Sequence, residues 1–192
     1  MKKLHSFDEV FDGQKVFRLV LEAMSNPGRK VSISEKAEKM YGDNKAFLAL
    51  AITLLDNEVS FSTCDNKDLA ENISLLTLSK EDTSENADFI FVENEELLEE
   101  VFSKAKCGTL EDPQKSATII IKTDESSKTT LSLYGAGIDG TQNFEMPLLV
   151  QKAIDIRKQQ NYEYPQGVDM IFVTNKAEIF CIPRLVLKKE EA

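Results

Sequence analysis

Residues 89–108 read FIFVENEELLEEVFSKAKCG, and this stretch decides the fold class. Phe89-Ile90-Phe91-Val92 is a continuous apolar run of the length expected for a strand that is covered on both faces. Directly after it, Asn94 can cap a helix that has acidic residues in its first turn and basic residues in its last, and Gly108 follows. A buried strand joined to a helix by a short connection is typical of α/β proteins. We therefore predict an α/β fold.

The sequence before this stretch predicts three further helices. The first, Lys15–Met24, has one apolar face and Asp12 as its expected N-cap. The second, Lys45–Leu55, is apolar on nearly every side and is the predicted core helix. The third follows Asp65, its expected cap. The residues predicted to point inward from the first helix are Val16, Phe17, Val20, Leu21 and Met24.

The sequence after it predicts two hairpins separated by a helix. Ala117–Lys122 and Thr129–Tyr134 form the first hairpin, and Val168–Thr174 pairs with Glu178–Ile182 in the second. The helix between them begins at Pro147, which suits a first helical position. Together these elements predict one domain over residues 1–192, a three-layer mixed β-sheet with helices on both faces. Residues from about 186 to 192 are expected to form a charged tail.

Composition excludes several classes of function. With 33 acidic and 23 basic residues, the net charge of −10 disfavours nucleic acid and anionic lipid as partners. Cys64, Cys107 and Cys181 are widely spaced and His5 is the one histidine, so we expect reduced thiols, no metal and no Cys-His catalytic pair. The longest apolar run is too short to span a bilayer and no signal peptide is recognisable, so we predict a cytoplasmic protein.

Three glycines follow the predicted strand Leu131–Tyr134 with the spacing G-x-G-x-x-G, at Gly135, Gly137 and Gly140. This spacing binds a dinucleotide only where it opens a helix and an acidic residue ends the next strand. Here the next helix begins only near Pro147, and the position for the acidic residue falls inside that helix. The glycines are therefore interpreted as a turn that joins the sheet to the helix after Pro147.

Two charged residues lie in otherwise apolar surroundings. Asp169 follows Gly167-Val168 at the start of a predicted strand, and Arg184 follows Pro183 at the end of the last one. A buried charge needs a partner, so each belongs either to an internal ion pair or to a pocket. No phosphate-binding loop and no G-x-S-x-G nucleophile motif occurs in the chain.

Several segments together resemble the PhnH family, the H components of the bacterial carbon-phosphorus lyase. They follow the family's order and span most of the chain. They are Phe17-Arg18 with Ala23–Gly28, Leu54–Asn57, Leu133–Ile138, Tyr164–Asp169 and Ile182–Arg184. This chain departs from the family at Leu185-Val186, where threonines are common, and at Ala136, where proline is common. The first departure puts a polar pocket around Arg184 in doubt, and the second implies a looser turn.

The resemblance implies a homodimeric, non-catalytic structural subunit that joins the G, I and J subunits in a core complex for alkylphosphonate breakdown. These partners would form ribose 1-methylphosphonate 5-triphosphate and cleave the C–P bond. It also implies the fold of pyridoxal-phosphate-dependent transferases without the cofactor, and no catalytic, cofactor-binding or metal-binding residue. The candidate pocket or interface residues are Phe17, Arg18, Met24, Asn26, Pro27, Gly28, Asp56, Gly135, Gly137, Pro165, Gly167, Asp169, Pro183 and Arg184.

Two other functions stay open from the residues alone. One is a stand-alone enzyme that binds a nucleotide or pyridoxal phosphate through the glycine turn, Arg18, Asp169 and Arg184. The other is a sensor of small anions, whose folded state phosphate or phosphonate would stabilise.

Overall fold

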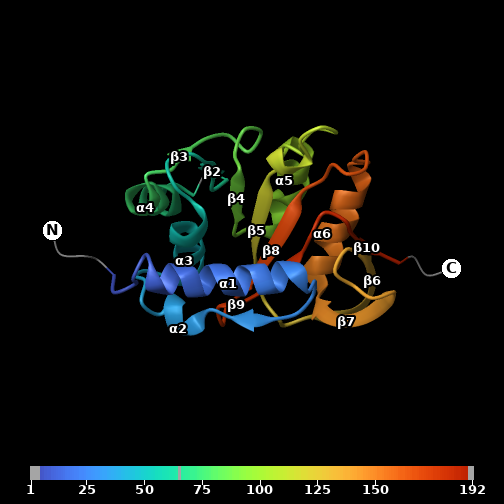
Figure 1. Cartoon of the computed structure of the whole chain (residues 1–192), viewed down its shortest axis with the longest axis horizontal. Coiled ribbons are helices and arrows are strands. Elements are labelled where there is room, and N and C mark those ends of the chain that lie inside the picture. Colours follow the sequence, from blue (N-terminus) through green and yellow to red (C-terminus); the bar gives the residue numbers. More distant parts are fainter. Residues whose placement is uncertain (1–4, 65, 190–192) are drawn as a thin grey trace.

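The computed structural model describes residues 5–64 and 66–189, which form a seven-stranded sheet with helices on both faces and a smaller second sheet (Figure 1). The order of the main sheet is β1-β9-β8-β5-β4-β2-β3. From β8 to β3 all neighbours are parallel, and β9 is antiparallel to both β8 and β1. Its strands are β1 (Val31–Ser32), β2 (Ser60–Ser62), β3 (Lys80–Glu81), β4 (Phe89–Val92), β5 (Thr118–Thr123), β8 (Asp169–Thr174) and β9 (Glu178–Ile182). The mixed α/β class predicted from residues 89–108 is confirmed.

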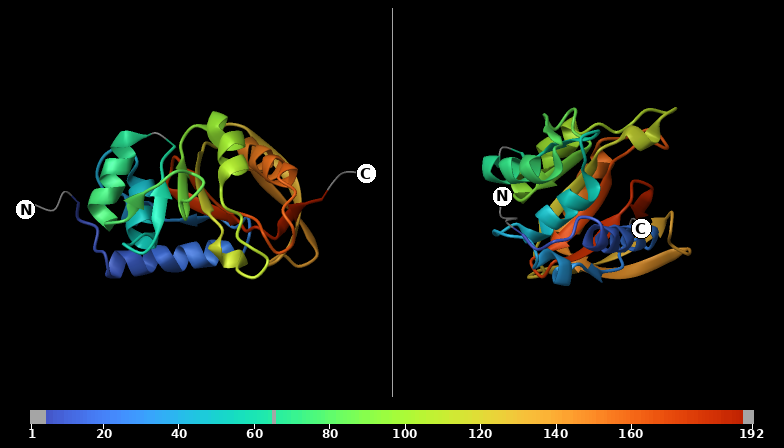
Figure 2. Two further views of the ribbon diagram at one scale, coloured as in Figure 1. Left: turned by 90° about the horizontal axis from the view of Figure 1, so that it is seen from above. Right: turned by 60° about the vertical axis from the view of Figure 1, so that its left-hand side comes forward.

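Alternate residues of the central strands pack into two cores, one on each face of the main sheet. Phe91, Ile120 and Ile171 face one core, and their neighbours Ile90 and Ile119 face the other. The first core is covered by α1 (Phe11–Ser25), α2 (Ser34–Ala37), α3 (Lys45–Leu54) and α4 (Lys67–Thr77). The second core is covered by α5 (Leu98–Lys104), which follows the 3-10 turn Glu95–Leu97, by α6 (Leu148–Gln159) and by the second sheet. Figure 2 shows α6 and the second sheet at the end of the molecule opposite α4.

The second sheet has the order β10-β6-β7, formed by β6 (Lys128–Gly135), β7 (Thr141–Pro147) and β10 (Val186–Lys188). Two predictions are therefore wrong. β5 and β6 are not a hairpin, because Ile119, Ile120 and Ile121 are buried and suit the centre of a parallel sheet, where β5 pairs with β4 and β8. The predicted tail also begins too early, since Val186 is buried and Val186–Lys188 pairs with β6.

The buried helix is confirmed as α3, in which Leu50 is 0% exposed. The inward face predicted for the first helix is partly wrong. Val16 and Val20 are buried, but Phe17 and Leu21 are 44% and 48% exposed. The apolar stripe of α1 is thus wider than the surface that the core covers, and one edge of it faces outward.

One predicted helix cap is wrong, and another falls on a residue outside the described part of the chain. Asp12 lies inside α1 and is buried, whereas the Asp8 carboxylate accepts hydrogen bonds from the backbone N–H groups of Val10 and Phe11. Asp65 lies outside the described residues, and the Asn66 side chain accepts the N–H of Leu69 at the start of α4. The predicted cap at Asn94 is confirmed by its hydrogen bond from the N–H of Glu96.

Candidate functional site

The glycine run forms the turn between β6 and β7 and packs against the Asn26-Pro27-Gly28 segment. Gly137 has φ +82°, and a Cβ there would lie 2.8 Å from Pro27 Cδ. At Gly28 a Cβ would lie 2.6 Å from Met146 Cε, and at Gly135 it would lie 2.2 Å from the carbonyl oxygen of Leu185. At Gly135 and Gly137 the obstacles include backbone carbonyls, so close approach of the chain requires glycine there. At Gly28 the obstacles are side-chain atoms, and the positive φ angle favours glycine at all three positions. The prediction that the turn leads directly to the helix is wrong, because β7 intervenes.

Asp169 and Arg184 form an ion pair between the start of β8 and the segment after β9. The carboxylate of Asp169 accepts from the backbone N–H of Arg184 at 2.8 Å and from its Nε at 3.1 Å, and the Nη2 of Arg184 donates to the same carboxylate. Nη1 of Arg184 donates to the carbonyl of Pro113. Gly167 permits this arrangement, because a Cβ there would lie 3.1 Å from Arg184 Cβ. Of the two alternatives left open above, the ion pair is present, and Arg184 also lines a cavity.

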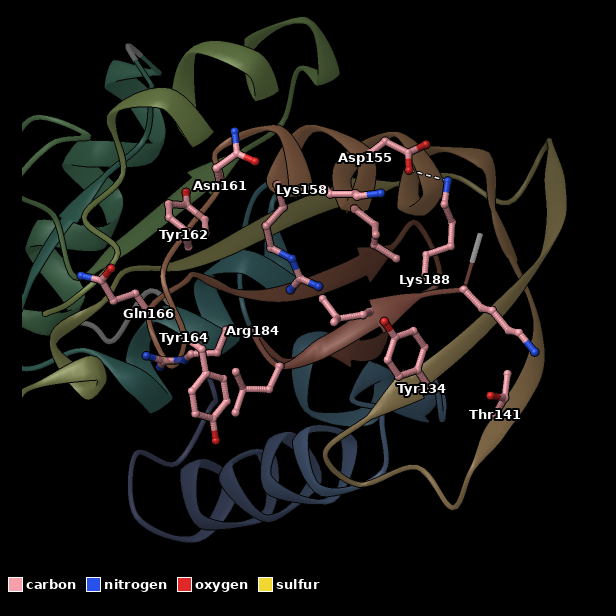
Figure 3. Close-up of a pocket in the computed structure, with 15 residues that line it drawn as sticks. Tyr134, Thr141, Asp155, Lys158, Asn161, Tyr162, Tyr164, Gln166, Arg184 and Lys188 are labelled. Carbon is pink, nitrogen blue, oxygen red and sulfur yellow. Dashed lines mark ion pairs between the residues drawn. The ribbon is translucent and has the colours of Figure 1, made fainter. Parts of the chain in front are cut away.

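This cavity, here called the α6 cavity, has a volume of about 860 Å³ and lies between α6, the α6–β8 connection, β10 and the ends of β6 and β7 (Figure 3). It lies beside the amino-terminal end of β8, which begins at Asp169. Its size suits a ligand of the dimensions of a cofactor or drug. The residues of its wall are Tyr134, Thr141, Ile154, Asp155, Arg157, Lys158, Asn161, Tyr162, Tyr164, Gln166, Arg184, Leu185, Leu187, Lys188 and Lys189.

Arg157 is the residue of this wall that sequence reasoning missed. It is 5% exposed, and its guanidinium donates to the backbone carbonyls of Val168, Ile182, Pro183 and Val186. The side chain thereby ties α6 to β8, β9 and β10. Burial lowers the pKa of Arg157 to about 10, so it stays charged at neutral pH. Its burial could have been predicted from the sequence, because Arg157 lies four residues after the inward-facing Ala153. This spacing places Arg157 on the buried face of the helix.

Other polar groups of the α6 cavity are held by specific partners. Lys188 pairs with Asp155 of α6. The Tyr162 hydroxyl donates to the carbonyl of Phe102 at 3.2 Å, and burial raises the pKa of Tyr162 to about 12. This phenol is therefore neutral at physiological pH and acts as a hydrogen-bond donor. The arrangement can bind an anion, but it does not resemble a nucleophile paired with a base.

A second hollow of about 540 Å³ lies at the carboxyl ends of β4, β5 and β8, and we call it the carboxyl-end hollow. α/β proteins commonly bind ligands at this end of the sheet. Here Lys122 lies 3.4 Å from Glu93 and Lys152 lies 3.7 Å from Glu95, so both lysines of this hollow already have carboxylate partners. Both of its cationic groups are thus paired within the protein.

The remaining candidate residues do not all meet at one place. Phe17, Arg18 and Asn26 are exposed on α1 and at its C-terminal end, and the Asp56 carboxylate accepts the N–H of Glu58 in a local turn. Met24 lies on α1 and packs against the first core. The other candidates lie near the β6–β7 turn or the cavity wall, and they are Pro27, Gly28, Gly135, Gly137, Pro165, Gly167 and Pro183.

Within residues 5–64 and 66–189, no group of three His, Cys, Asp or Glu side chains is arranged to hold a metal ion. In the same part of the chain, every helix is too short or too polar to cross a membrane.

The fold and the cavity define an α/β protein with a basic hollow beside its main sheet. The model of a family described as "Bacterial phosphonate metabolism protein (PhnH)" matches residues 5–187. The chain belongs to this PhnH family, so the resemblance seen in the sequence is confirmed. One relative, named "Putative C-P lyase subunit protein HtxG" from Stutzerimonas stutzeri, is 28% identical over 172 residues, which cover 89% of this chain and 83% of the relative.

Proposed function

We propose that this protein is a non-catalytic structural subunit of the carbon-phosphorus lyase core complex that breaks down alkylphosphonates. The observation that carries the proposal is the family match over residues 5–187, supported by a relative that is named as a C–P lyase subunit. In this proposal the chain forms a homodimer in the cytoplasm and joins the G, I and J subunits. Those partners form ribose 1-methylphosphonate 5-triphosphate and cleave the C–P bond.

The outer face of α1 supports a role in assembly. Val10, Phe17 and Leu21 share one side of this helix and are 71%, 44% and 48% exposed, and the nearby Phe11 is 68% exposed. Large apolar side chains gathered on one surface mark interfaces more often than free surfaces. We assign this α1 stripe, defined as Val10, Phe11, Phe17 and Leu21, to contact with one of the G, I and J partners.

Co-purification tests the proposal. Tagged protein is expressed with its host's G, I and J partners, and we expect all four proteins to elute together. The double variant Phe17→Glu/Leu21→Glu should elute without the partners, because charges replace the centre of the α1 stripe. Leu75→Glu is the matched control, since Leu75 is 60% exposed on α4 and lies outside the stripe. Wild-type protein that elutes alone would refute the assembly.

We also propose that the whole chain is one domain with the fold of pyridoxal-phosphate-dependent transferases, without a bound cofactor. The seven-stranded, mostly parallel sheet with helices on both faces supports this proposal. After incubation with pyridoxal phosphate and removal of the free cofactor by gel filtration, the protein should retain no absorbance of a lysine-bound cofactor. Unfolding in urea should show one transition with coincident optical probes. Retained cofactor absorbance or two separate transitions would contradict these proposals.

A further inference from the structure

The α6 cavity carries an excess of positive charge in a chain whose net charge is −10. Apart from Lys158, the basic residues of its wall are Arg157, Arg184, Lys188 and Lys189. Carboxylates balance two of these, since Asp169 pairs with Arg184 and Asp155 pairs with Lys188. A hollow lined mainly by one sign of charge concentrates ions of the opposite sign. The cavity therefore favours an anion.

Arg157 is the buried cation of this cavity, and its hydrogen bonds hold it in one position. Among the described residues no carboxylate lies in ion-pair contact with its guanidinium, which instead donates through Nη1 and Nη2 to four backbone carbonyls. Its Nε has no hydrogen-bond partner in that part of the chain. Burial lowers the pKa of Arg157, and Asp169, which is paired with Arg184, opposes this shift only from beyond ion-pair distance. An anion in the cavity would supply opposite charge at contact distance and an acceptor for this buried guanidinium.

Aromatic rings border the same space. Tyr134 and Tyr164 are 39% and 78% exposed, and both lie below Asp155 and Lys158 of α6 in the view of Figure 3. Asn161 and Gln166 add amide groups to the wall. Exposed phenol rings stack on the flat faces of bases and sugars, and amides form hydrogen bonds with their hydroxyl groups. A bare inorganic anion would leave this part of the cavity unused.

We propose that the α6 cavity binds a small molecule in which a phosphate or phosphonate group is attached to a ribose or a nucleoside. The phosphorus oxyanion lies toward Arg157 and Lys189, and the ring lies toward Tyr134 and Tyr164. The binding site is formed by this chain alone and does not rest on the proposed assembly. Binding to the purified protein and co-purification with partners can therefore succeed or fail independently.

Calorimetric titration of the purified protein tests this inference with four probes: ATP, ribose 5-phosphate, methylphosphonate and inorganic phosphate. ATP or ribose 5-phosphate should bind with a Kd below about 1 mM. Methylphosphonate and phosphate should bind at least about tenfold more weakly, because they lack the ring that stacking stabilises. If phosphate bound as tightly as ATP, the role of the tyrosines would be refuted.

Two single variants locate the ligand. Tyr164→Ala and Lys189→Gln should each weaken binding of the ring-bearing probes about fivefold to tenfold with unchanged melting temperature, because both side chains are exposed. Lys152→Gln is the matched control for Lys189→Gln, since Lys152 lies on α6 but lines the carboxyl-end hollow. Unchanged affinity in both test variants would overturn the assignment.

Amide chemical shifts provide a test that does not depend on variants. Adding ATP should shift resonances of residues 155–166 and 184–189. Shifts confined to residues 93–95, 122–127 and 175 would place the ligand in the carboxyl-end hollow, and the absence of any saturable shift would mean that neither hollow binds it. Either result would refute the proposal.

Discussion

The two hollows of this protein lie at opposite ends of β8 and differ in how their charges are balanced. In the carboxyl-end hollow each lysine has a nearby carboxylate, Glu93 for Lys122 and Glu95 for Lys152. In the α6 cavity Arg157 is buried against backbone carbonyls, with no carboxylate contact among the described residues. α/β sheets usually bind ligands at the carboxyl end. We therefore assign a ligand to the α6 cavity because of the charge balance of its lining, and not because of its place in the fold.

The largest expected effect comes from disrupting the core that supports both hollows. Leu50→Asp places a charge in α3, where Leu50 is 0% exposed within the core of one face. We expect a loss of more than about 4 kcal/mol in the free energy of unfolding, enough to abolish soluble folding. Expression yield and circular dichroism measure this loss of folding. A variant that expresses and melts normally would show that the core is assigned wrongly.

A smaller effect acts on the α6 cavity alone. Arg157→Met should lower the free energy of unfolding by about 3 kcal/mol, because four carbonyls lose their donor. Arg157→Lys keeps the charge and should lose less. Urea unfolding measures the stability of both variants, and Gln159→Met, a change at an exposed neighbour on α6, is the control. Equal stabilities of Arg157→Met and the wild type would mean that the arginine does not hold these strands together.

Asp12 is also a buried charge, but unlike Arg157 it has side chains of opposite charge in contact with it. Lys39 Nζ lies 2.7 Å from its carboxylate and Lys36 Nζ lies 3.7 Å away. The hydrogen bond from Lys39 lowers the pKa of Asp12, although burial partly opposes the shift. Asp12→Asn should therefore lose about 1.5–3 kcal/mol at neutral pH.

This loss should depend on pH. A carboxylate whose folded pKa is lowered stabilises the protein above its unfolded pKa, and the contribution disappears as the pH falls through the folded pKa. The difference between wild type and Asp12→Asn should thus be largest near pH 7 and shrink below about pH 4. Urea unfolding at several pH values measures it. A constant difference would contradict the role of the charge.

The smallest effect is expected at the carboxyl-end hollow. Lys122→Met removes one partner of a pair whose side chains are 40% and 25% exposed. The free energy of unfolding should change by only about 0.5 kcal/mol, since solvent screens such a pair. ATP affinity should stay the same. A tenfold loss of affinity would reverse the comparison between the two hollows.

The sequence predicted those helices and strands whose hydrophobic pattern fits only one kind of secondary structure. The apolar run Phe89–Val92, the buried helix around Leu50 and the hairpin of β8 and β9 all formed as expected. Strand pairing was harder to predict. β5 and β6 are adjacent in sequence, but β5 pairs with β4 and with the distant β8, whereas β6 pairs with β7, the strand that follows it. Periodicity does not identify such partners.

The candidate site was predicted only in part. Asp169 and Arg184 stood out as charges in apolar segments, and the structure pairs them. Arg157 did not stand out, because a basic residue near the end of a helix ordinarily faces solvent. The cavity could not be predicted, since its wall combines four segments that only the folded chain brings together.

The contacts of the β6–β7 turn have a consequence for how this sequence can evolve. Gly137 meets Pro27 and Gly135 meets Leu185, segments that lie far apart in the chain. A mutation that adds a side chain at either glycine displaces a distant segment. In a mutational scan, positions 135 and 137 should therefore tolerate few substitutions. A smaller residue at position 27 should partly relieve changes at position 137, whereas no change at position 185 should rescue position 135, because that clash is with a carbonyl oxygen that every residue carries. These two glycines thus serve close packing of the chain on itself rather than chemistry.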